Sequence, residues 1–353
     1  MPSSPTPCIA FIITKSEVGG AQRWVLDQIK LLEQHVKCIV ITGERGWLSE
    51  SIQKAQVFIE PALLRRPPTP GGLWRLSRIL KQNNVSSLVA SSANAGIYAR
   101  LVRIILPRLY VVYVSHGWSS IYNGGKLETV YTSLERLLAR MTHKVLCVSE
   151  SDLERAMNRI RIAPEKCTLI TNAIFPEQKE ISQALPRSPW KILFVGRLAS
   201  PKRPDLLIEA VKLLSSVEVE LTIVGDGPQN SLLITENNQR IKWLGEIKGF
   251  SDFGSYHIFC LISDSEGLPM SALEACANGT PVLLSEVGGC PELVTTNGLT
   301  TPNSAEEISK KIITIINDYS RFSMEARRQA KKYDIREKTQ NYLDLYLNQA
   351  SDQ

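Results

Sequence analysis

Residues 258–278 read IFCLISDSEGLPMSALEACAN, and the order of residue types in this stretch indicates the fold class. The first five residues are apolar, which predicts a β-strand covered on both faces. A short loop with Gly267 and Pro269 follows, and from Met270 onward the residues are mostly small or apolar over a helical length. A buried strand that runs directly into a helix is the repeating unit of a parallel α/β sheet.

The same alternation continues on both sides of this stretch. It predicts a doubly wound α/β architecture, in which short, continuous apolar strands are separated by helices. The predicted strands cover 9–14, 38–42, 87–90, 110–115, 144–149, 191–195, 220–224, 258–262 and 281–284. The predicted helices cover 21–32, 73–82, 127–141, 151–159, 205–214, 270–278 and 305–316.

The chain has two halves of opposite charge. Its 353 residues carry a formal net charge of +6, with +10 in residues 1–175 and −4 in residues 176–353. Residues 175–190 contain three prolines and no strand pattern, as expected of a linker. We therefore predict one domain over 1–175, a linker over 176–190 and a second domain over 191–332.

Several classes of protein are excluded by what the sequence lacks. The seven cysteines are never spaced as Cys-x-x-Cys and the four histidines are far apart, so a zinc site and a disulfide framework are not expected. The N-terminal residues lack the features of a signal peptide, and no apolar run reaches the ~18 residues of a membrane-spanning helix. We expect a cytoplasmic protein, and the small basic excess does not by itself predict nucleic-acid binding.

Common nucleotide fingerprints are also incomplete. The run Gly225-Asp226-Gly227 lacks the third glycine of a dinucleotide site, and Lys126 is followed by Leu127 rather than by the Ser or Thr of a P-loop. No Asp-x-Asp pair exists, so the sequence lacks the usual mark of a metal site for a nucleotide-sugar diphosphate.

Two cations follow the predicted strand 191–195. Arg197 lies directly after Gly196, and Lys202 lies five residues beyond Arg197. Open α/β sheets bind ligands at the carboxyl ends of their strands, and an Arg with a Lys suits a diphosphate. Two solvated surface cations are the alternative.

Two carboxylates flank the start of the helix predicted at 270–278. Glu266 lies in the loop before it, and Glu274 projects from a helix whose neighbouring positions are small or apolar. The unpaired backbone N–H groups of Met270 and Ser271 would form an anion site there. Glu274, an acid near the positive end of that helix, would then accept hydrogen bonds from ligand hydroxyls, although unrelated surface acids are the usual reason for such a pair.

Two motifs in the first half are weaker. Gly19 and Gly20 lie between a strand and a helix, where glycine permits a positive φ and a close ligand approach. An ordinary turn between strand and helix is the usual explanation of such a pair. His116 ends the strand 110–115 and precedes Gly117, although a lone histidine is usually structural.

Taken in order, these motifs resemble a known family, the retaining glycosyltransferases of family 4. The resemblance runs from about Phe11 to Tyr346 and is densest over 191–300. It implies the GT-B fold, which has two Rossmann-like domains with an interdomain cleft. It also implies that the C-terminal segment 333–347 packs back on the first domain. The motifs that carry it are Gly196-Arg197-Leu198 with Lys202, Glu266-x7-Glu274, Gly279-Thr280-Pro281-Val282, Gly288-Gly289 and Pro291-Glu292.

The resemblance implies a role for each site residue. Arg197 and Lys202 would hold the donor diphosphate and stabilise it as it leaves, Glu266 would contact the transferred sugar, and Glu274 the ribose. His116 would point at the transferred sugar, and the base would lie near residues 244–247. The implied catalytic residues are Arg197, Lys202, Glu266 and His116. The implied donor-binding residues are Gly19, Gly20, Gly196, Arg197, Lys202, Gly245, Ile247, Glu266, Gly267, Leu268, Met270, Ser271 and Glu274.

Two positions depart from the family pattern. On the acceptor side, Gln22 replaces the usual Glu after the Gly-Gly-Ala run, and at the end of the first domain Ala173 replaces the Gly of the Asn-Gly pair. The implied reaction retains the anomeric configuration and uses no metal or other cofactor. Its implied donor is a nucleotide-sugar, with uridine as the default base. The alternatives are a nucleotide-sugar epimerase of the same fold and a non-catalytic binding protein.

The sequence between Glu60 and Glu128 contains no acidic residue. In a glycosyltransferase the first domain binds the acceptor. We therefore predict that the stretch 61–127 docks on an anionic membrane, at the inner face of the cell membrane, and receives a lipid-linked saccharide. A generally basic solvated surface is the alternative. The cations of the stretch 61–127 are Arg65, Arg66, Arg75, Arg78, Lys81, Arg100, Arg103, Arg108 and Lys126. Large apolar residues lie between them in the sequence, namely Leu63, Leu64, Leu73, Trp74 and Trp118.

Overall fold

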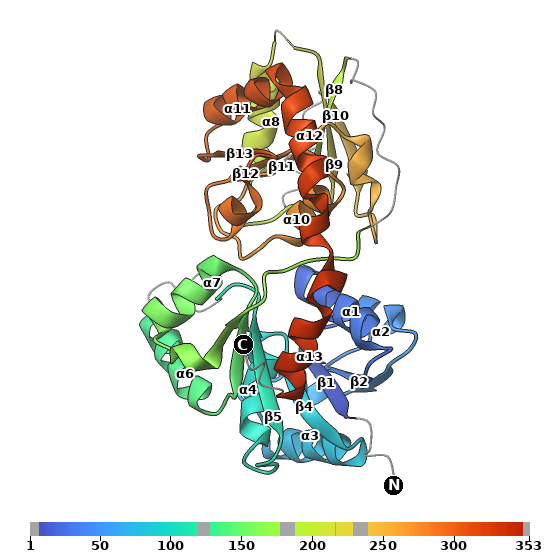
Figure 1. The fold of residues 1–353 in the computed structure, drawn as a ribbon, viewed down its shortest axis with the longest axis vertical. Helices are drawn as coiled ribbons and strands as arrows, with labels where there is room; N and C mark the ends of the chain where they lie inside the picture. The colour runs from blue at the N-terminus through green and yellow to red at the C-terminus, as the bar shows by residue number, and fades with distance from the viewer. Residues whose placement is uncertain (1–6, 119–127, 177–187, 216, 229–238, 349–353) are drawn as a thin grey trace. The chain divides into compact units, whose positions relative to one another are not determined.

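The chain forms two compact units, each built around one parallel sheet (Figure 1). The computed structural model describes residues 7–118, 128–176, 188–215, 217–228 and 239–348. The first unit consists of Met1–Thr171 and Ile335–Gln353, and the second of Asn172–Asp334. Residues 177–187 of the predicted linker lie outside the described residues, so the linker stays a prediction.

The sheet of the first unit has seven strands in the order β3-β2-β1-β4-β5-β6-β7. All pairs of neighbours are parallel. The central strands are apolar and fully covered, because the connecting helices lie on both faces of a parallel sheet. The strands are β1 (Cys8–Ile13), β2 (Lys37–Thr42), β3 (Gln56–Ile59), β4 (Val85–Ala90), β5 (Tyr110–Ser115), β6 (Lys144–Cys147) and β7 (Cys167–Leu169).

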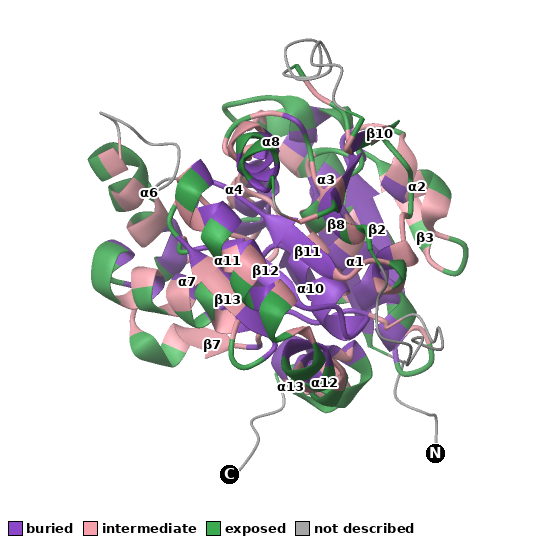
Figure 2. Cartoon of the chain, turned by 90° about the horizontal axis from the view of Figure 1, so that it is seen from above, coloured by how far each residue is buried: buried purple, intermediate pink, exposed green. Residues whose placement is uncertain are grey.

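The helices of the first unit bury one face each, and Figure 2 shows the buried side in purple. On most of them apolar residues recur at helical spacing on the covered face. The helix Glu128–Arg140 differs, because only its Leu138 and Ala139 are buried. The helices are α1 (Gly20–Leu32), α2 (Trp47–Ser51), α3 (Pro70–Gln82), α4 (Ala93–Val102), α6 (Glu128–Arg140), α7 (Glu150–Arg155) and α13 (Thr339–Leu347).

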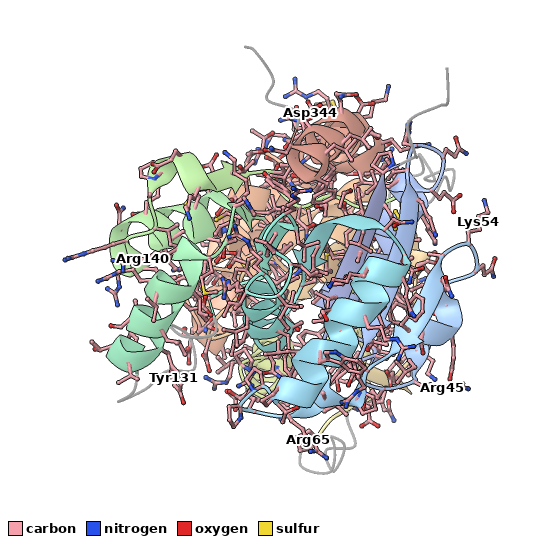
Figure 3. All side chains as sticks on the ribbon, turned by 90° about the horizontal axis from the view of Figure 1, so that it is seen from below. Arg45, Lys54, Arg65, Tyr131, Arg140 and Asp344 are labelled. Carbon is pink, nitrogen blue, oxygen red and sulfur yellow. The ribbon has the colours of Figure 1, made fainter. Side chains whose placement is uncertain are left out.

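Helix α13 completes the first unit from the far end of the sequence (Figure 1). Tyr346 packs edge-on against Phe11 of β1 with 5.7 Å between ring centroids, and its hydroxyl donates to Gln28 Oε1 at 3.0 Å. Asp344 lies on the outer side of the same helix (Figure 3). The buried aromatic face therefore fixes the C-terminal segment to the first unit, beginning at Ile335 rather than at residue 333.

The sheet of the second unit has six parallel strands in the order β10-β9-β8-β11-β12-β13. They are β8 (Trp190–Val195), β9 (Val219–Val224), β10 (Ile241–Gly245), β11 (Ile258–Leu261), β12 (Val282–Ser285) and β13 (Gly298–Thr301). The helices are α8 (Pro204–Leu213), α10 (Met270–Ala277), α11 (Ala305–Asn317) and α12 (Tyr319–Gln329).

The expected doubly wound α/β class is confirmed, and all nine predicted strands are present with shifts of one or two residues at their ends. The four strands that the sequence did not predict, β3, β7, β10 and β13, are the outer strands of the two sheets. An outer strand has only one neighbour and is less covered, so its sequence is short or mixed in polarity. No helix within the described residues is long and apolar enough to cross a membrane.

Candidate active site

The second sheet reverses its strand order between β8 and β11. From β8 the chain continues outward through β9 and β10, and from β11 it continues the other way through β12 and β13. The loops after β8 and β11 therefore diverge at their carboxyl ends and leave a place for a ligand between them. The predicted residues Arg197, Lys202 and Glu266 lie in these two loops.

Lys202 and Glu266 form a short ion pair across this point, and both side chains are mostly buried. The backbone holds the two loops in register. Arg203 N donates to Ile262 O at 2.9 Å, and Asp264 N donates to Pro201 O at 2.8 Å. The pair is therefore positioned by the main chain of both loops.

Arg197 is exposed at the tip of the first loop. Within the described part of the chain it has no ion-pair partner, so its guanidinium is available to an anion. The loop after β9 stabilises the loop that carries Arg197, because Leu198 N donates to Asp226 O at 2.9 Å. A Cβ on Gly225 would lie 1.9 Å from Gly196 O. Glycine at 225 thus serves close packing under the loop that carries Arg197, which explains this motif without a dinucleotide.

The Glu266 loop rests on the glycines after β12. Gly288 has a φ of +54°, and a Cβ on it would lie 1.7 Å from Glu266 O. Gly289 N donates to Gly267 O at 2.8 Å. The Gly288-Gly289 motif therefore supports the backbone of Glu266 and Gly267, and only glycine fits at 288.

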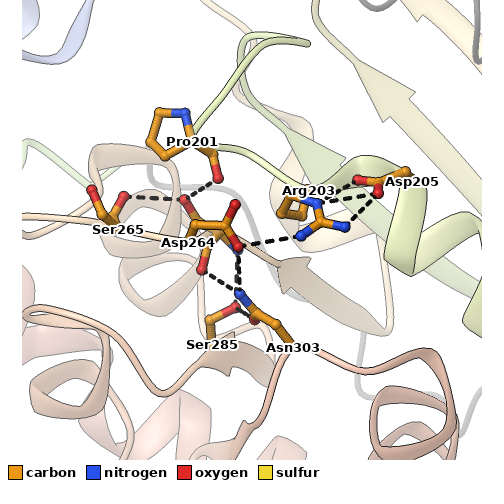
Figure 4. A network of polar contacts seen from close by, with 8 residues as sticks. Pro201, Arg203, Asp205, Asp264, Ser265, Ser285 and Asn303 are labelled. Carbon is orange, nitrogen blue, oxygen red and sulfur yellow. Dashed lines mark hydrogen bonds and ion pairs between the residues drawn. The ribbon is translucent and has the colours of Figure 1, made fainter. Parts of the chain in front are cut away.

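A polar network outside the predicted site residues ties the ends of three strands together (Figure 4). Asn303, after β13, donates through Nδ2 to Ser263 O at 2.9 Å and to Asp264 Oδ1 at 3.1 Å. Its Oδ1 accepts from Ser285 Oγ at 2.6 Å, and Ser263 N donates to Ser285 Oγ at 2.9 Å. Sequence reasoning missed Asn303, because an asparagine in a loop has no local signal.

Arg203 connects the same network to the loop after β8, which carries Arg197 and Lys202. Its guanidinium forms an ion pair with Asp205 at 2.8 Å and a longer one with Asp264 at 3.4 Å. Arg203 directly follows Lys202, so these contacts help to hold the lysine loop against the loop of Glu266 (Figure 4).

Helix α10 begins beside the Glu266 loop. Pro269 is its N-cap rather than its first helical residue, which corrects the sequence expectation by one position. No side chain caps the helix, so the N–H groups of Met270 and Ser271 remain for a ligand or water. Leu268 is buried beneath this turn, and Glu274 is half-buried one turn along the helix.

The residues expected near the base lie at the end of β10, two strands away from β8. Leu244 and Ile247 are exposed by 46% and 42%, and Gly245 has a φ of +67°. Gly245 O accepts a hydrogen bond from Gly225 N at 2.8 Å. This loop thus lies beside the one under Arg197, along the same sheet edge.

The first sheet reverses its strand order between β1 and β4. Thr14 and Ser92 follow these strands and share a hydrogen bond of 2.8 Å between their hydroxyls. Ser91 Oγ and His116 Nε2 are 2.7 Å apart, so the predicted histidine lies beside the reversal point. Sequence reasoning missed Ser91 and Ser92, since serine is common in loops.

His116 is held neutral by its surroundings. Desolvation lowers its pKa to about 4, and the Trp24 ring packs edge-on with 5.1 Å between centroids. The turn after it is fixed, because Gly117 N donates to Asp152 Oδ2 at 3.1 Å and Trp118 Nε1 donates to Asp152 O at 2.9 Å. A neutral imidazole can exchange hydrogen bonds with sugar hydroxyls.

The glycine pair after β1 differs from the expectation. Gly19 has an extended backbone with φ −177°, so no positive φ is needed, and Gly20 is the first residue of α1. A Cβ on Gly19 would lie 2.6 Å from Gln22 Oε1. Gln22 Nε2 donates to Lys15 O at 3.2 Å, so this buried side chain braces the loop.

The basic stretch 61–127 is only partly a surface. Arg100 is fully buried, pairs with Glu135 at 3.0 Å and lies 4.0 Å from the centroid of the Tyr113 ring. Trp118 is buried as well, and Lys126 lies outside the described residues. Leu63 is fully buried too, so the prediction of a single basic face was wrong for Leu63, Arg100 and Trp118. The exposed cations are Arg65, Arg66, Arg75, Arg78, Lys81 and Arg108.

The comparisons with known proteins cover both units. Residues 18–178 match the family model described as Glycosyltransferase Family 4, and residues 176–336 match Glycosyl transferases group 1. The O-antigen biosynthesis glycosyltransferase WbnH of Escherichia coli is 40% identical over 340 residues, covering 96% of this chain and 97% of WbnH.

Two further proteins are more distant. An E. coli UDP-Gal:alpha-D-GlcNAc-diphosphoundecaprenol alpha-1,3-galactosyltransferase is 25% identical over 312 residues and covers 80% of each chain. The crystal structure of Anabaena HepE in complex with UDP and glucose superposes with a TM-score of 0.78 at 19% identity, covering 97% of this chain and 99% of HepE. The chain therefore belongs to the family 4, group 1 glycosyltransferases, which are retaining enzymes with the GT-B fold.

Proposed function

We propose that this glycosyltransferase moves a hexose from a UDP-hexose to a lipid-diphosphate-linked saccharide during O-antigen assembly. The observation that carries the proposal is the Lys202–Glu266 pair at the strand reversal of the second sheet, beside exposed Arg197. The similarity to WbnH supports the pathway, and the diphosphoundecaprenol galactosyltransferase supports the class of acceptor.

The cations account for donor binding and departure. Cleavage of the anomeric bond leaves extra negative charge on the diphosphate, and Arg197 with Lys202 would stabilise that charge. The ammonium of Lys202 has three donors and gives one of them to Glu266, so a phosphate oxygen can be added without breaking the pair. The uncapped start of α10 adds backbone donors for the same anion.

The carboxylates would bind hydroxyls rather than act as a hydrolase pair. Glu266 would contact the transferred sugar and Glu274 the ribose, while Leu244 and Ile247 would pack on the base. Retention then follows from front-face displacement, in which the departing phosphate takes the proton of the incoming hydroxyl. The pKa of about 4 leaves His116 neutral, so its proposed role is to orient a sugar hydroxyl.

No metal is required by this proposal, because protein cations and helix N–H groups supply the positive charge. Family membership favours transfer over the epimerase and over the non-catalytic binding protein. We place the enzyme at the cytoplasmic face of the membrane, where a lipid-linked acceptor is presented.

A transfer assay tests the proposal. The protein is incubated with a saccharide linked to a lipid diphosphate and, in separate reactions, with radiolabelled UDP-glucose, UDP-galactose, UDP-N-acetylglucosamine or UDP-N-acetylgalactosamine. We expect one donor to extend the lipid-linked product, with one UDP released for each sugar transferred. Release of a donor epimer instead of an extended product, or no turnover with any donor, would contradict the proposal.

A further inference from the structure

Helix α6 presents an apolar face to solvent. Val130, Tyr131, Leu134 and Leu137 lie on one side of the helix, and their exposed fractions are 61%, 44%, 43% and 55%. Only Leu138 and Ala139 of this helix are buried. Figure 2 shows α6 almost entirely exposed or intermediate, and Figure 3 shows Tyr131 toward one end of its outer side. An apolar stripe of this length on an exposed helix marks a contact surface.

The acidic residues of the same helix are paired with arginines. Glu128 pairs with Arg159 at 2.9 Å, and Glu135 pairs with the buried Arg100 at 3.0 Å. Both carboxylates are thus used within the first unit, and the outward face of α6 has no acidic side chain. Its polar positions are Thr129, Ser133 and Arg140.

The turn after α4 extends this face at the C-terminal end of α6. Arg103 Nη1 donates to Met141 O, which places the turn beside the last residues of α6. The next two residues of the turn, Ile104 and Ile105, are exposed by 72% and 40%, and Arg108 follows them on the surface. Apolar side chains and cations therefore continue together from the helix to the turn.

We propose that this surface docks on an anionic lipid bilayer with α6 lying along the interface. We name it the α6 surface, made of Ile104, Ile105, Val130, Tyr131, Leu134 and Leu137 with the exposed cations Arg108 and Arg140. The inference rests on the proposed lipid-linked acceptor, which must be met at a membrane. The sequence predicted a membrane contact over the whole stretch 61–127, whereas the α6 surface consists of helix α6 and the turn after α4.

Charge complementarity favours a bilayer over another occupant. An interfacial helix buries apolar side chains among the acyl chains, while flanking arginines meet the anionic headgroups. A second copy of this chain would bring the same arginines together across the contact, and like charges oppose such pairing. The α6 surface is therefore more complementary to an anionic bilayer than to a second copy of this chain.

Vesicle flotation of the full chain tests the α6 surface. We expect the protein to float with vesicles of phosphatidylcholine and phosphatidylglycerol and to bind at least about tenfold more weakly to pure phosphatidylcholine. Leu134→Glu with Leu137→Glu should reduce binding to the anionic vesicles by at least about tenfold. The matched control is Leu213→Glu on α8 of the second unit, where a leucine with a similar exposure of 53% should be replaceable without effect.

A fluorescence increase on membrane binding provides a second test, which does not depend on the folding of the double glutamate variant. Val130→Cys in a Cys167→Ser background is labelled with an environment-sensitive dye, since the other cysteines are buried. The dye should brighten with anionic vesicles and stay unchanged with neutral ones. Flotation of the double glutamate variant like wild type, or no brightening of the dye, would overturn the proposal.

A transfer assay separates this inference from the proposed function. The double glutamate variant should keep wild-type turnover on a water-soluble, short-chain acceptor and lose turnover on an acceptor embedded in vesicles. If wild type transfers to neither acceptor, the proposed function is wrong, whatever the flotation result. If wild type is a dimer in solution and the double variant a monomer, the α6 surface is a self-interface and the membrane proposal fails.

Discussion

At the scale of single residues, Lys202 and Arg197 differ in how they are prepared for an anion. Lys202 is mostly buried and already paired with Glu266, while Arg197 is exposed at the tip of its loop. In the proposed mechanism Lys202 is therefore held in place before the donor binds, and Arg197 closes on the diphosphate afterwards. In that mechanism both cations stabilise the negative charge that develops on the leaving diphosphate.

Replacement of either cation should lower turnover. We expect Arg197→Ala and Lys202→Ala each to reduce kcat by about 100-fold, the typical loss when one charge-stabilising donor is removed. Initial rates of UDP release measure this, with Tm recorded because Lys202→Ala also leaves Glu266 unpaired. The control is Lys331→Ala, an exposed lysine of the second unit that should retain wild-type turnover. Near-normal rates in both test variants would remove the two cations from the mechanism.

His116 should make the stability of the fold depend on pH. Its pKa is lowered from 6.5 to about 4, so between these values the unfolded chain binds a proton that the folded chain does not. Stability from the neutral ring is thus fully present above pH 6.5 and is lost as the pH falls toward 4. Urea unfolding at several pH values should show a shallower acid dependence for His116→Gln than for wild type. The remaining dependence includes that of His257, whose pKa is also lowered to about 4. Equal dependence in both proteins would contradict the assignment to His116.

At the scale of elements, loops after strands carry the candidate site, and their supports come from neighbouring strands. The Glu266 loop follows β11, yet glycines after β12 and Asn303 after β13 hold it. Each of these contacts can be removed by a single substitution outside the proposed contacts with substrate.

Substitution of Gly288 separates steric support from backbone strain. Gly288 and Gly249 have similar positive φ values of +54° and +71°, but a Cβ would meet Glu266 O only at 288 and nothing at 249. Gly249→Ala should cost about 1–2 kcal/mol for its backbone alone. Gly288→Ala should cost at least about 2 kcal/mol more and raise the KM for the donor. Urea unfolding and donor titration measure both effects, and equal losses for the two variants would mean that the Glu266 loop moves freely.

Asn303 should act as a positioning residue for the Glu266 loop. Asn303→Ala removes the hydrogen bonds to Ser263, Asp264 and Ser285, so kcat/KM for the donor should fall by about tenfold or more through misplacement of the loop. Asn317→Ala, at an exposed end of α11, is the matched control. A purely structural role would lower Tm and leave kcat/KM at 20 °C unchanged, which would contradict this reading.

The central elements were predictable because a strand covered on both faces leaves a continuous apolar run, as in 258–262. The outer strands were not, since β3 and β10 are short and partly exposed. Arg197, Lys202 and Glu266 could be proposed from the sequence because each lies in a loop that follows such an apolar run. Asn303 and Ser91 were not found, because their importance comes from contacts made by distant parts of the chain.

At the scale of the whole molecule, each unit places its candidate residues at the strand reversal of its own sheet. In the first unit these are Ser91, Ser92 and His116, and in the second Lys202 and Glu266. Strand order depends on which strands pair over long sequence distances, so the reversals could not be read from local patterns. The C-terminal return to the first unit was expected only from the family resemblance.

The stereochemistry of the product tests the proposed retaining, metal-independent transfer. Wild-type protein is supplied with a UDP-hexose of known anomeric configuration and a lipid-linked acceptor, in buffer with EDTA, and the new linkage is determined from its anomeric proton coupling. We expect retention of configuration, one UDP released for each linkage, and a rate unchanged by EDTA. An inverted linkage, or a rate lost in EDTA and restored by a divalent cation, would contradict this proposal.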